Sequence, residues 1–306
     1  MLCFGSVVVL ALVASPSVTL RAPRTASHTC TPIASLGAQQ LDDSVAASRI
    51  GLMQRQERED LKSQLLRVCA TCNRGFGASL LDRACIGSLL LRLAAVNPAE
   101  DPTAGVAGSD GSVPGWKGRG LENSGELDGT IAPGPLEGCW RLVYTNASDV
   151  LSLDVNPIAG VGPISQEVTL PDRVTNVIDF YPRAASVLPP GMLRTSTRLR
   201  VLTRARARSA TRVGLTFEQV EIEPRALLGF DLSQLLPALS LPLPRLPGSN
   251  RAGADSDTSP AFFDVLYLDQ EMLIIQQNEP GGVFVAVRES AEELRLRSDP
   301  NVAAMS

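Results

Sequence analysis

The chain has 306 residues, with 28 basic and 32 acidic side chains and a formal net charge of -4 at pH 7. This acidic balance excludes a general nucleic-acid binder, because neutralising phosphates requires an excess of Lys and Arg. The hydrophobic fraction of 44% is ordinary for a globular protein, and no run reaches the roughly 18 apolar residues that a membrane-spanning helix needs. We expect one main folded core.

The N-terminal region, residues 1–49, has the composition of two targeting signals in series. The apolar run VVVLALVAS and the small residues after it are typical of a signal peptide. The next stretch carries Arg, Ser and Thr but no acid before Asp42, as in an organelle transit peptide. This order resembles the bipartite address of algae whose plastids lie behind ER-derived membranes. An ordinary secreted protein is the alternative.

Residues 50–97 have helical apolar spacing. One stripe includes Leu61 and Leu65, a second includes Leu89 and Leu93, and the segment NRGFG separates them, so the pattern predicts a helical hairpin. The segment NPAEDP ends it, because proline cannot continue a helix. Residues 98–135 are rich in Gly, Ser, Pro and Asp without periodicity, which predicts a flexible linker.

A Cys-x-x-Cys motif, Cys69 and Cys72, lies on the first helical stripe. Such a pair can be redox-active or form half of a zinc site. The chain has no second pair, and its one histidine, His28, falls in the targeting segment. We therefore expect buried structural thiols, with no metal and no cofactor.

The segment from Leu136 onward turns β-like. Trp140, Leu142 and Tyr144 follow Gly138 with the period of two of a half-buried strand, which predicts that the three side chains share one face. Further strands are expected near 164–170, 174–180, 193–204, 211–222, 262–268, 271–277 and 282–288. About eight antiparallel strands over residues 136–290 predict a mainly β fold, a barrel that closes on itself, followed by a tail at 291–306. The apolar, proline-broken residues 235–250 cannot form a central strand.

Two amides, Gln166 and Asn176, lie on the apolar inward face of their strands. Leaving such a group unsatisfied costs about 1–3 kcal/mol, so each needs a partner. The partner is either the other amide or the backbone, or else a carbonyl or hydroxyl of a ligand in the barrel. Tyr267 and Asp269 also share a strand face, where they form either a structural hydrogen bond or an acid–base pair.

An arginine ladder follows one face of the strand near 193–204 and its extension: Arg194, Arg198, Arg200, Arg204, Arg206 and Arg208 all have the same parity. A solvated outer barrel face explains the alternation. Docking on anionic lipid headgroups explains the excess of positive charge in an acidic protein. The ladder has no interleaved aromatic residues, which argues against single-stranded nucleic acid.

Three blocks, LEGCWRLVYTNASD, GPISQEVTLPDRVTNVIDF and FFDVLYLDQEMLIIQQNEPGGVFVAV, resemble the conserved blocks of the plastid lipid-associated proteins, also called fibrillins. The predicted hairpin is similar to that family's N-terminal helix pair, so the resemblance spans residues 57–288. It implies a lipocalin-like barrel, in which Gly138 and Trp140 match the Gly-x-Trp of the first strand. The tryptophan would then close one end of a lipid-sized cavity. Leu273 and Gln276 stand where members commonly carry Arg, which argues against a headgroup contact there.

The resemblance implies a non-enzymatic plastid protein that associates with thylakoid or plastoglobule lipid and an anionic lipid surface. It would hold an apolar prenylquinone, carotenoid or fatty acid. The acidic composition predicts that it does not bind nucleic acid. The candidate ligand contacts are Trp140, Tyr144, Gln166, Asn176, Tyr267 and Asp269. An enzyme or enzyme accessory of plastid isoprenoid-quinone metabolism is one alternative, although the usual catalytic motifs are missing from the sequence. A secreted lipocalin-type carrier is another.

Overall fold

The computed structural model describes residues 39–108, 134–183, 196–227, 230–232, 235–242, 261–278 and 281–298. The targeting segment up to residue 38, Arg194 of the arginine ladder and the tail beyond residue 298 lie outside these ranges. No helix in the described part is long and apolar enough to cross a membrane.

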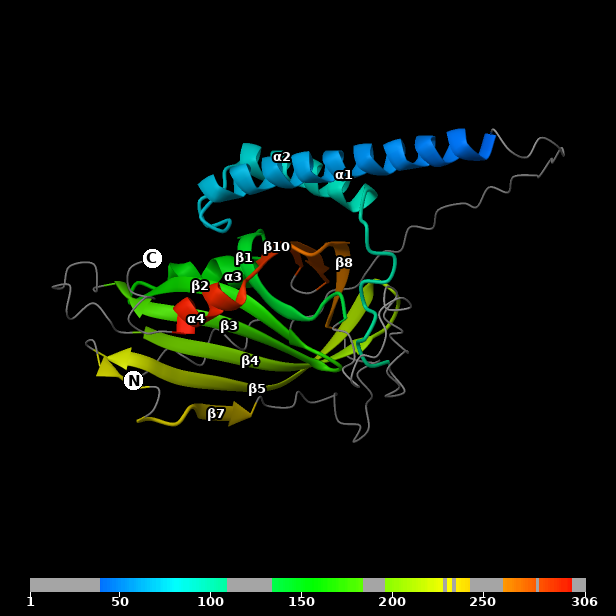
Figure 1. Cartoon of the computed structure of the whole chain (residues 1–306). Helices are drawn as coiled ribbons and strands as arrows, with labels where there is room; N and C mark the ends of the chain where they lie inside the picture. The colour runs from blue at the N-terminus through cyan, green and yellow to red at the C-terminus, as the bar shows by residue number, and fades with distance from the viewer. Residues whose placement is uncertain are drawn as a thin grey trace.

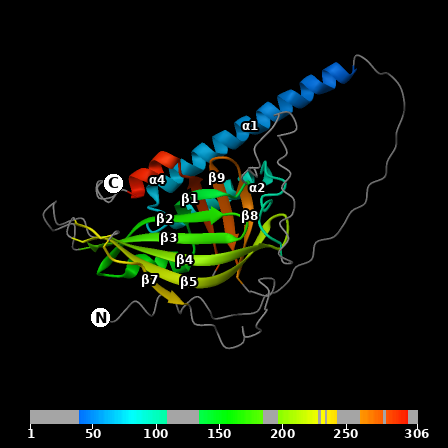
Figure 2. The same ribbon diagram turned by 60° about the horizontal axis from the view of Figure 1, so that its bottom comes forward.

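Two helices precede the sheet and form the expected hairpin. Helix α1 (Gln39–Thr71) begins before residue 50, where the sequence pattern placed its start, and runs on past the sheet (Figures 1 and 2). Helix α2 (Leu80–Ala95) starts with a capping box, in which the side chains of Ser79 and Asp82 each accept the other's backbone N–H. The two helices lie side by side over one side of the sheet (Figure 1).

The remaining elements are strands with three short helices. The strands are β1 (Gly138–Thr145), β2 (Ala159–Thr169), β3 (Arg173–Pro182), β4 (Ser196–Ala207), β5 (Arg212–Leu227), β6 (Phe230–Asp231), β7 (Leu239–Pro242), β8 (Phe262–Leu268), β9 (Met272–Gln277) and β10 (Gly282–Arg288). The helices are α3 (Ser148–Leu151), the 3-10 helix η1 (Ser152–Val155) and α4 (Ala291–Ser298). As the prolines of its segment require, β7 is no central strand: it pairs with β5 alone, off the main path of the sheet.

The antiparallel sheet closes on itself. Its strands follow the order β4-β3-β2-β1-β10-β9-β8-β5, and β5 also pairs with β4. The contact between β5 and β8 consists of three residue pairs, and the first of them, Arg212 and Asp264, carries a two-pronged ion pair with N···O distances of 2.7 and 2.9 Å. The mainly β fold with a preceding helical pair is thus confirmed.

Closure divides the strands into an inner and an outer face and gives the sheet two ends. The β2–β3, β4–β5 and β8–β9 turns lie at the end where β1 begins, which we call the tryptophan end. There the inner face is packed around Trp140, which is fully buried with Val168, Val174 and Phe263. The cavity between Val106, Leu136, Val168 and Val174 measures about 10 Å³. This is about the minimum that a single water needs, so the space between these four residues is closely packed.

Two β-bulges change the face of two tyrosines. The register shifts between Leu142 and Tyr144 in β1, and between Val265 and Tyr267 in β8. The residue before each bulge pairs with a residue of the apolar cluster on the inner face, which we call the inner cluster. Both tyrosines instead pack with Ile274, in a second apolar cluster between the outer face and the helices. The expectation that Tyr144 shares a face with Trp140 is therefore wrong, because a bulge reverses the alternation.

The start of the predicted linker is folded. Val106 is 2% exposed and belongs to the inner cluster at the tryptophan end. The backbone N–H of Ala107 donates to Pro171 (2.8 Å), and the Thr103 hydroxyl donates to the carbonyl of Ser209 (2.8 Å). A flexible linker is therefore wrong for residues 98–108, where small apolar residues fill the end of the sheet without any periodic pattern. Residues 109–133 lie outside the described ranges.

Arg288 seals the tryptophan end. Its guanidinium lies 4.2 Å from the ring centre of Trp140 and donates to the carbonyls of Gln270 (2.8 Å), Glu137 (2.5 Å) and Pro135 (3.2 Å). The indole N–H of Trp140 donates to the carbonyl of Leu136 at 2.9 Å. The Arg288 guanidinium and the indole N–H are therefore paired while the ring itself is buried.

Gly138→Ala is expected to lower the free energy of unfolding by about 1–3 kcal/mol. Gly138 has a φ of +137°, and an added Cβ would lie 2.3 Å from an Arg288 nitrogen. In helix α1, a Cβ on Gly51 meets nothing within 4 Å, so Gly51→Ala is the control and should stabilise the protein by about 0.5–1 kcal/mol. Urea unfolding measures both, and equal effects would contradict the account of this end.

Candidate functional site

The two inward amides bond to each other. Gln166 and Asn176 are directly opposite on β2 and β3, and the Gln166 amide nitrogen donates to the Asn176 side-chain oxygen at 3.0 Å. Gln166 is also directly opposite Trp140 of β1, so the amides lie beside the tryptophan on the inner face. Within the described ranges the Gln166 oxygen and the Asn176 nitrogen have no further partner. Mutual bonding thus leaves the Gln166 oxygen as an acceptor and the Asn176 amide nitrogen as a donor on this wall.

A third polar group on the inner face has no partner. Thr203 of β4 is opposite Val174, is 3% exposed, and its hydroxyl makes no hydrogen bond in the described structure. An orphaned buried hydroxyl costs about 1–3 kcal/mol and calls for an explanation. The sequence indicates its direction, since Thr203 alternates with the ladder arginines, but it gives no sign that the hydroxyl lacks a partner.

Next to the amides, the inner face of β4 and β5 is apolar and only partly covered. Leu199 and Val201 of β4, opposite Ile178 and Asn176, are half-buried. Phe217 of β5 pairs with Thr203 and is 44% exposed. Paired residues share a face, so solvent reaches inner-face side chains on this side of the sheet. Here β5 has left β8 and pairs with β7 instead.

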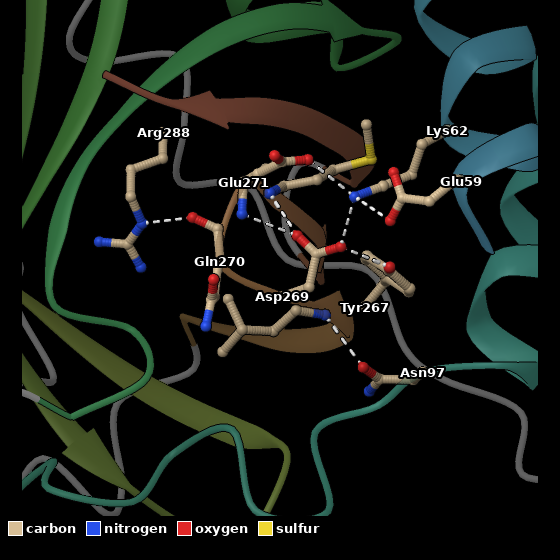
Figure 3. Close-up of polar contacts among 10 residues, drawn as sticks. Glu59, Lys62, Asn97, Tyr267, Asp269, Gln270, Glu271 and Arg288 are labelled. Atoms are coloured by element: carbon tan, nitrogen blue, oxygen red, sulfur yellow. Dashed lines mark hydrogen bonds and ion pairs between the residues drawn. The ribbon is translucent and has the colours of Figure 1, made fainter. Parts of the chain in front are cut away.

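Tyr267 and Asp269 form a polar cluster outside the sheet, under the helices (Figure 3). The Tyr267 hydroxyl donates to Asp269 at 2.7 Å, and the Lys62 ammonium from α1 donates to the same carboxylate oxygen at 2.9 Å. The other Asp269 oxygen accepts the backbone N–H groups of Glu271 and Met272, both at 2.8 Å. This carboxylate therefore fixes the β8–β9 turn and binds it to α1.

The charges in this cluster are those of a structural ion pair. Burial alone would raise the pKa of Asp269, but hydrogen bonds from Tyr267, Lys62 and two backbone amides hold that pKa below its usual value. Burial and the bond to Asp269 raise the pKa of Tyr267. Burial alone would lower the pKa of Lys62, but its three carboxylate partners raise it. All three pKa values move away from neutrality, which favours the structural hydrogen bond over an acid–base pair.

Four of the five described ladder arginines pair with carboxylates on neighbouring strands or in the β2–β3 turn. Arg198, 6% exposed, makes a two-pronged ion pair with Asp179 (2.7 and 2.9 Å). Arg200 pairs with Glu167 at 2.8 Å. Arg204 pairs with Glu218 at 2.6 Å and with Asp172 at 3.8 Å, and Arg206 pairs with Asp172 at 3.6 Å. The Arg208 guanidinium lies 5.9 Å from the Phe262 ring centre. Docking of the ladder on anionic headgroups stays a prediction, and these ion pairs reduce the positive charge that it offers.

The thiols of the Cys-x-x-Cys motif are buried, as expected. Cys69 is 2% exposed and Cys72 fully buried, both beneath the helices. Burial and the neighbouring Cys72 raise the pKa of Cys69 to about 12, so its reactive thiolate form is disfavoured. Among the described residues, no group of three or more His, Cys, Asp and Glu side chains could hold a metal ion.

Lys62→Met is expected to lower the free energy of unfolding by about 3–5 kcal/mol, because it leaves the Asp269 carboxylate without its counter-charge. The control is Arg92→Met. Arg92 pairs with Glu57 at 3.7 Å, but both side chains are at least half exposed, so the loss should stay below about 1 kcal/mol. Both are measured by urea unfolding at pH 7. A small loss for Lys62→Met would show that the cluster does not hold α1 to the sheet.

Comparison with known protein families matches residues 121–287 to the family described as PAP_fibrillin. No curated protein and no solved structure gives a significant match. The matched segment covers more than half of the chain and includes β1 to β9 and nearly all of β10, while the helical hairpin lies before it. The chain therefore belongs to the PAP_fibrillin family, the plastid lipid-associated proteins.

Proposed function

We propose that this protein is a non-catalytic lipid-associated protein of the plastid, which holds one apolar molecule against the inner face of its closed sheet. The observation that carries the proposal is the buried, unpartnered hydroxyl of Thr203 on the same face as the Gln166–Asn176 pair. Ligand sites are commonly apolar walls with a few placed polar groups, and this face has that composition.

The polar groups favour a class of ligand. The Asn176 side chain can donate from its amide nitrogen, and the Thr203 hydroxyl can donate or accept. A ligand that carries a carbonyl or hydroxyl on an apolar body would satisfy both groups. Of the three expected classes, a prenylquinone or a fatty acid therefore fits this wall better than a hydrocarbon carotenoid. Val201 and Phe217 add partly exposed apolar surface to the same wall.

The proposed location of the protein has a part that family membership supports and a part that is proposed here. Membership of the family implies the plastid. Residence at thylakoid or plastoglobule lipid, and import through the bipartite signal of residues 1–49, belong to the proposal.

The test is ligand binding by Thr203→Val, titrated with a short-chain prenylquinone and a fatty acid. Quenching of Trp140 fluorescence reports binding, with the second tryptophan, Trp116, replaced by Phe. Removing an unpartnered buried hydroxyl should leave the melting temperature unchanged or raise it. The dissociation constant should nevertheless rise roughly tenfold, about 1.4 kcal/mol, because the ligand's oxygen loses its partner.

Thr216→Val is the matched control. The Thr216 hydroxyl is also buried without a partner, but Thr216 pairs with Arg204 on the outer face. This variant should bind like the parent. Equal affinity in Thr203→Val and Thr216→Val would mean that the ligand does not touch the inner wall at Thr203.

A further inference from the structure

Two aliphatic side chains protrude at the end of the sheet opposite the tryptophan end. Val155 closes η1 and is 79% exposed, and Ile158 precedes β2 and is 76% exposed. Asn156 and Pro157 between them are exposed as well. We call residues 155–158 the Val155–Ile158 tip. Val155 and Ile158 lie on one turn and form a small exposed apolar patch, and exposed apolar patches are a feature of contact surfaces.

The same segment packs into the sheet on its other side. Val150 of α3 and Leu153 of η1 pack against the buried residues Leu142, Val161 and Ile164. Leu142 and Ile164 lie on the inner face, opposite Ala286 and Ile178. The α3–η1 segment therefore connects the inner apolar cluster at this end with the exposed tip.

Several polar groups of the tip and of the residues beside it are hydrogen-bonded. The Asn156 side-chain oxygen accepts the backbone N–H groups of Ile158 (2.9 Å) and Ala159 (3.3 Å). Arg183 donates to the carbonyl of Asn156 (2.8 Å), and to the carbonyl (2.5 Å) and carboxylate (2.7 Å) of Asp154. Its backbone N–H donates to Ile158 at 2.8 Å. Leaving water costs little for polar groups that already have partners, and the one ion pair here is neutral as a whole.

An aromatic residue with a polar end lies beside the tip. Tyr181 of β3 pairs with Gly160 and is 46% exposed. Its ring lies over Gly160, where an added Cβ would come within 2.5 Å of it. Tyrosine suits a boundary between an apolar and an aqueous phase, because its ring can be buried while its hydroxyl stays wet.

We propose that the Val155–Ile158 tip inserts into a lipid surface and that the inner face exchanges its ligand with that surface through this end. The exchange rests on the proposed function; the lipid contact rests on the tip alone. A lipid phase is the favoured occupant because the tip is aliphatic, internally hydrogen-bonded and continuous with the inner apolar cluster. The contact uses apolar burial, so it needs no anionic headgroup and resists salt.

The experiment is flotation of the full chain with uncharged phosphatidylcholine vesicles at 0.1 and 0.5 M salt. The variant Val155→Ser/Ile158→Ser should bind at least about tenfold more weakly than the parent at both salt concentrations, since two aliphatic side chains no longer leave water. The matched control is Leu80→Ser/Leu91→Ser on α2, where the side chains are 87% and 77% exposed. This control should float like the parent.

Three results would overturn the proposal: equal flotation of the tip variant and the parent, loss of flotation in the α2 control, or a parent that is a dimer and a tip variant that is a monomer. Ligand binding is measured separately, with a water-soluble short-chain quinone and without vesicles. The tip variant should bind it like the parent. A parent that floats but binds no quinone would reject the proposed function and leave the lipid contact standing.

Discussion

The short contact between β5 and β8 is the constraint on which the rest of the structure depends. Three residue pairs join these strands, and Arg212 strengthens the contact through its ion pair with Asp264 and by lying 4.1 Å from the ring centre of Phe262. Without this contact the sheet would have two free edges and its inner face would be open along one side. With it, every strand of the closed ring has an inner face, and alternation along each of these strands assigns side chains to inside or outside.

The outer face of the sheet is covered by helices over some strands and carries cross-strand ion pairs over the others. Over β1, β10, β9 and β8 the helical hairpin covers it, held at the tryptophan end by Lys62 and Asp269. At the opposite end, Arg74 of the helix turn donates to the carbonyls of Val161 (2.9 Å) and Gly162. Over β3, β4 and β5, cross-strand ion pairs face the solvent instead. The unpartnered Thr203 hydroxyl lies on the inner face, which is why we place the ligand there.

Much of this arrangement follows from sequence periodicity. The sequence predicts the helical hairpin, the closed antiparallel sheet and the inward direction of Gln166 and Asn176. Apolar residues repeat with a period of 3.6 in a helix and 2 in a strand, and this repeat shows which side of the element is buried. The bulges beside Tyr144 and Tyr267 are not predicted, since one extra residue reverses the alternation without changing the composition. The pairing of Lys62 with Asp269 joins residues 207 positions apart, and no local pattern encodes it. The missing partner of Thr203 depends equally on distant strands.

The central claim is that the inner face holds an apolar molecule with few oxygen atoms. Native mass spectrometry of the full chain, incubated with a plastid lipid extract, tests it most directly. The account predicts one added mass per chain, which solvent extraction releases as an apolar compound with a carbonyl or hydroxyl group. Val201→Trp places a large ring on the inner face opposite Asn176, where the ligand would lie. This variant should not show the added mass. A chain that gains no mass, or a Val201→Trp variant that retains the same lipids as the parent, would contradict the account.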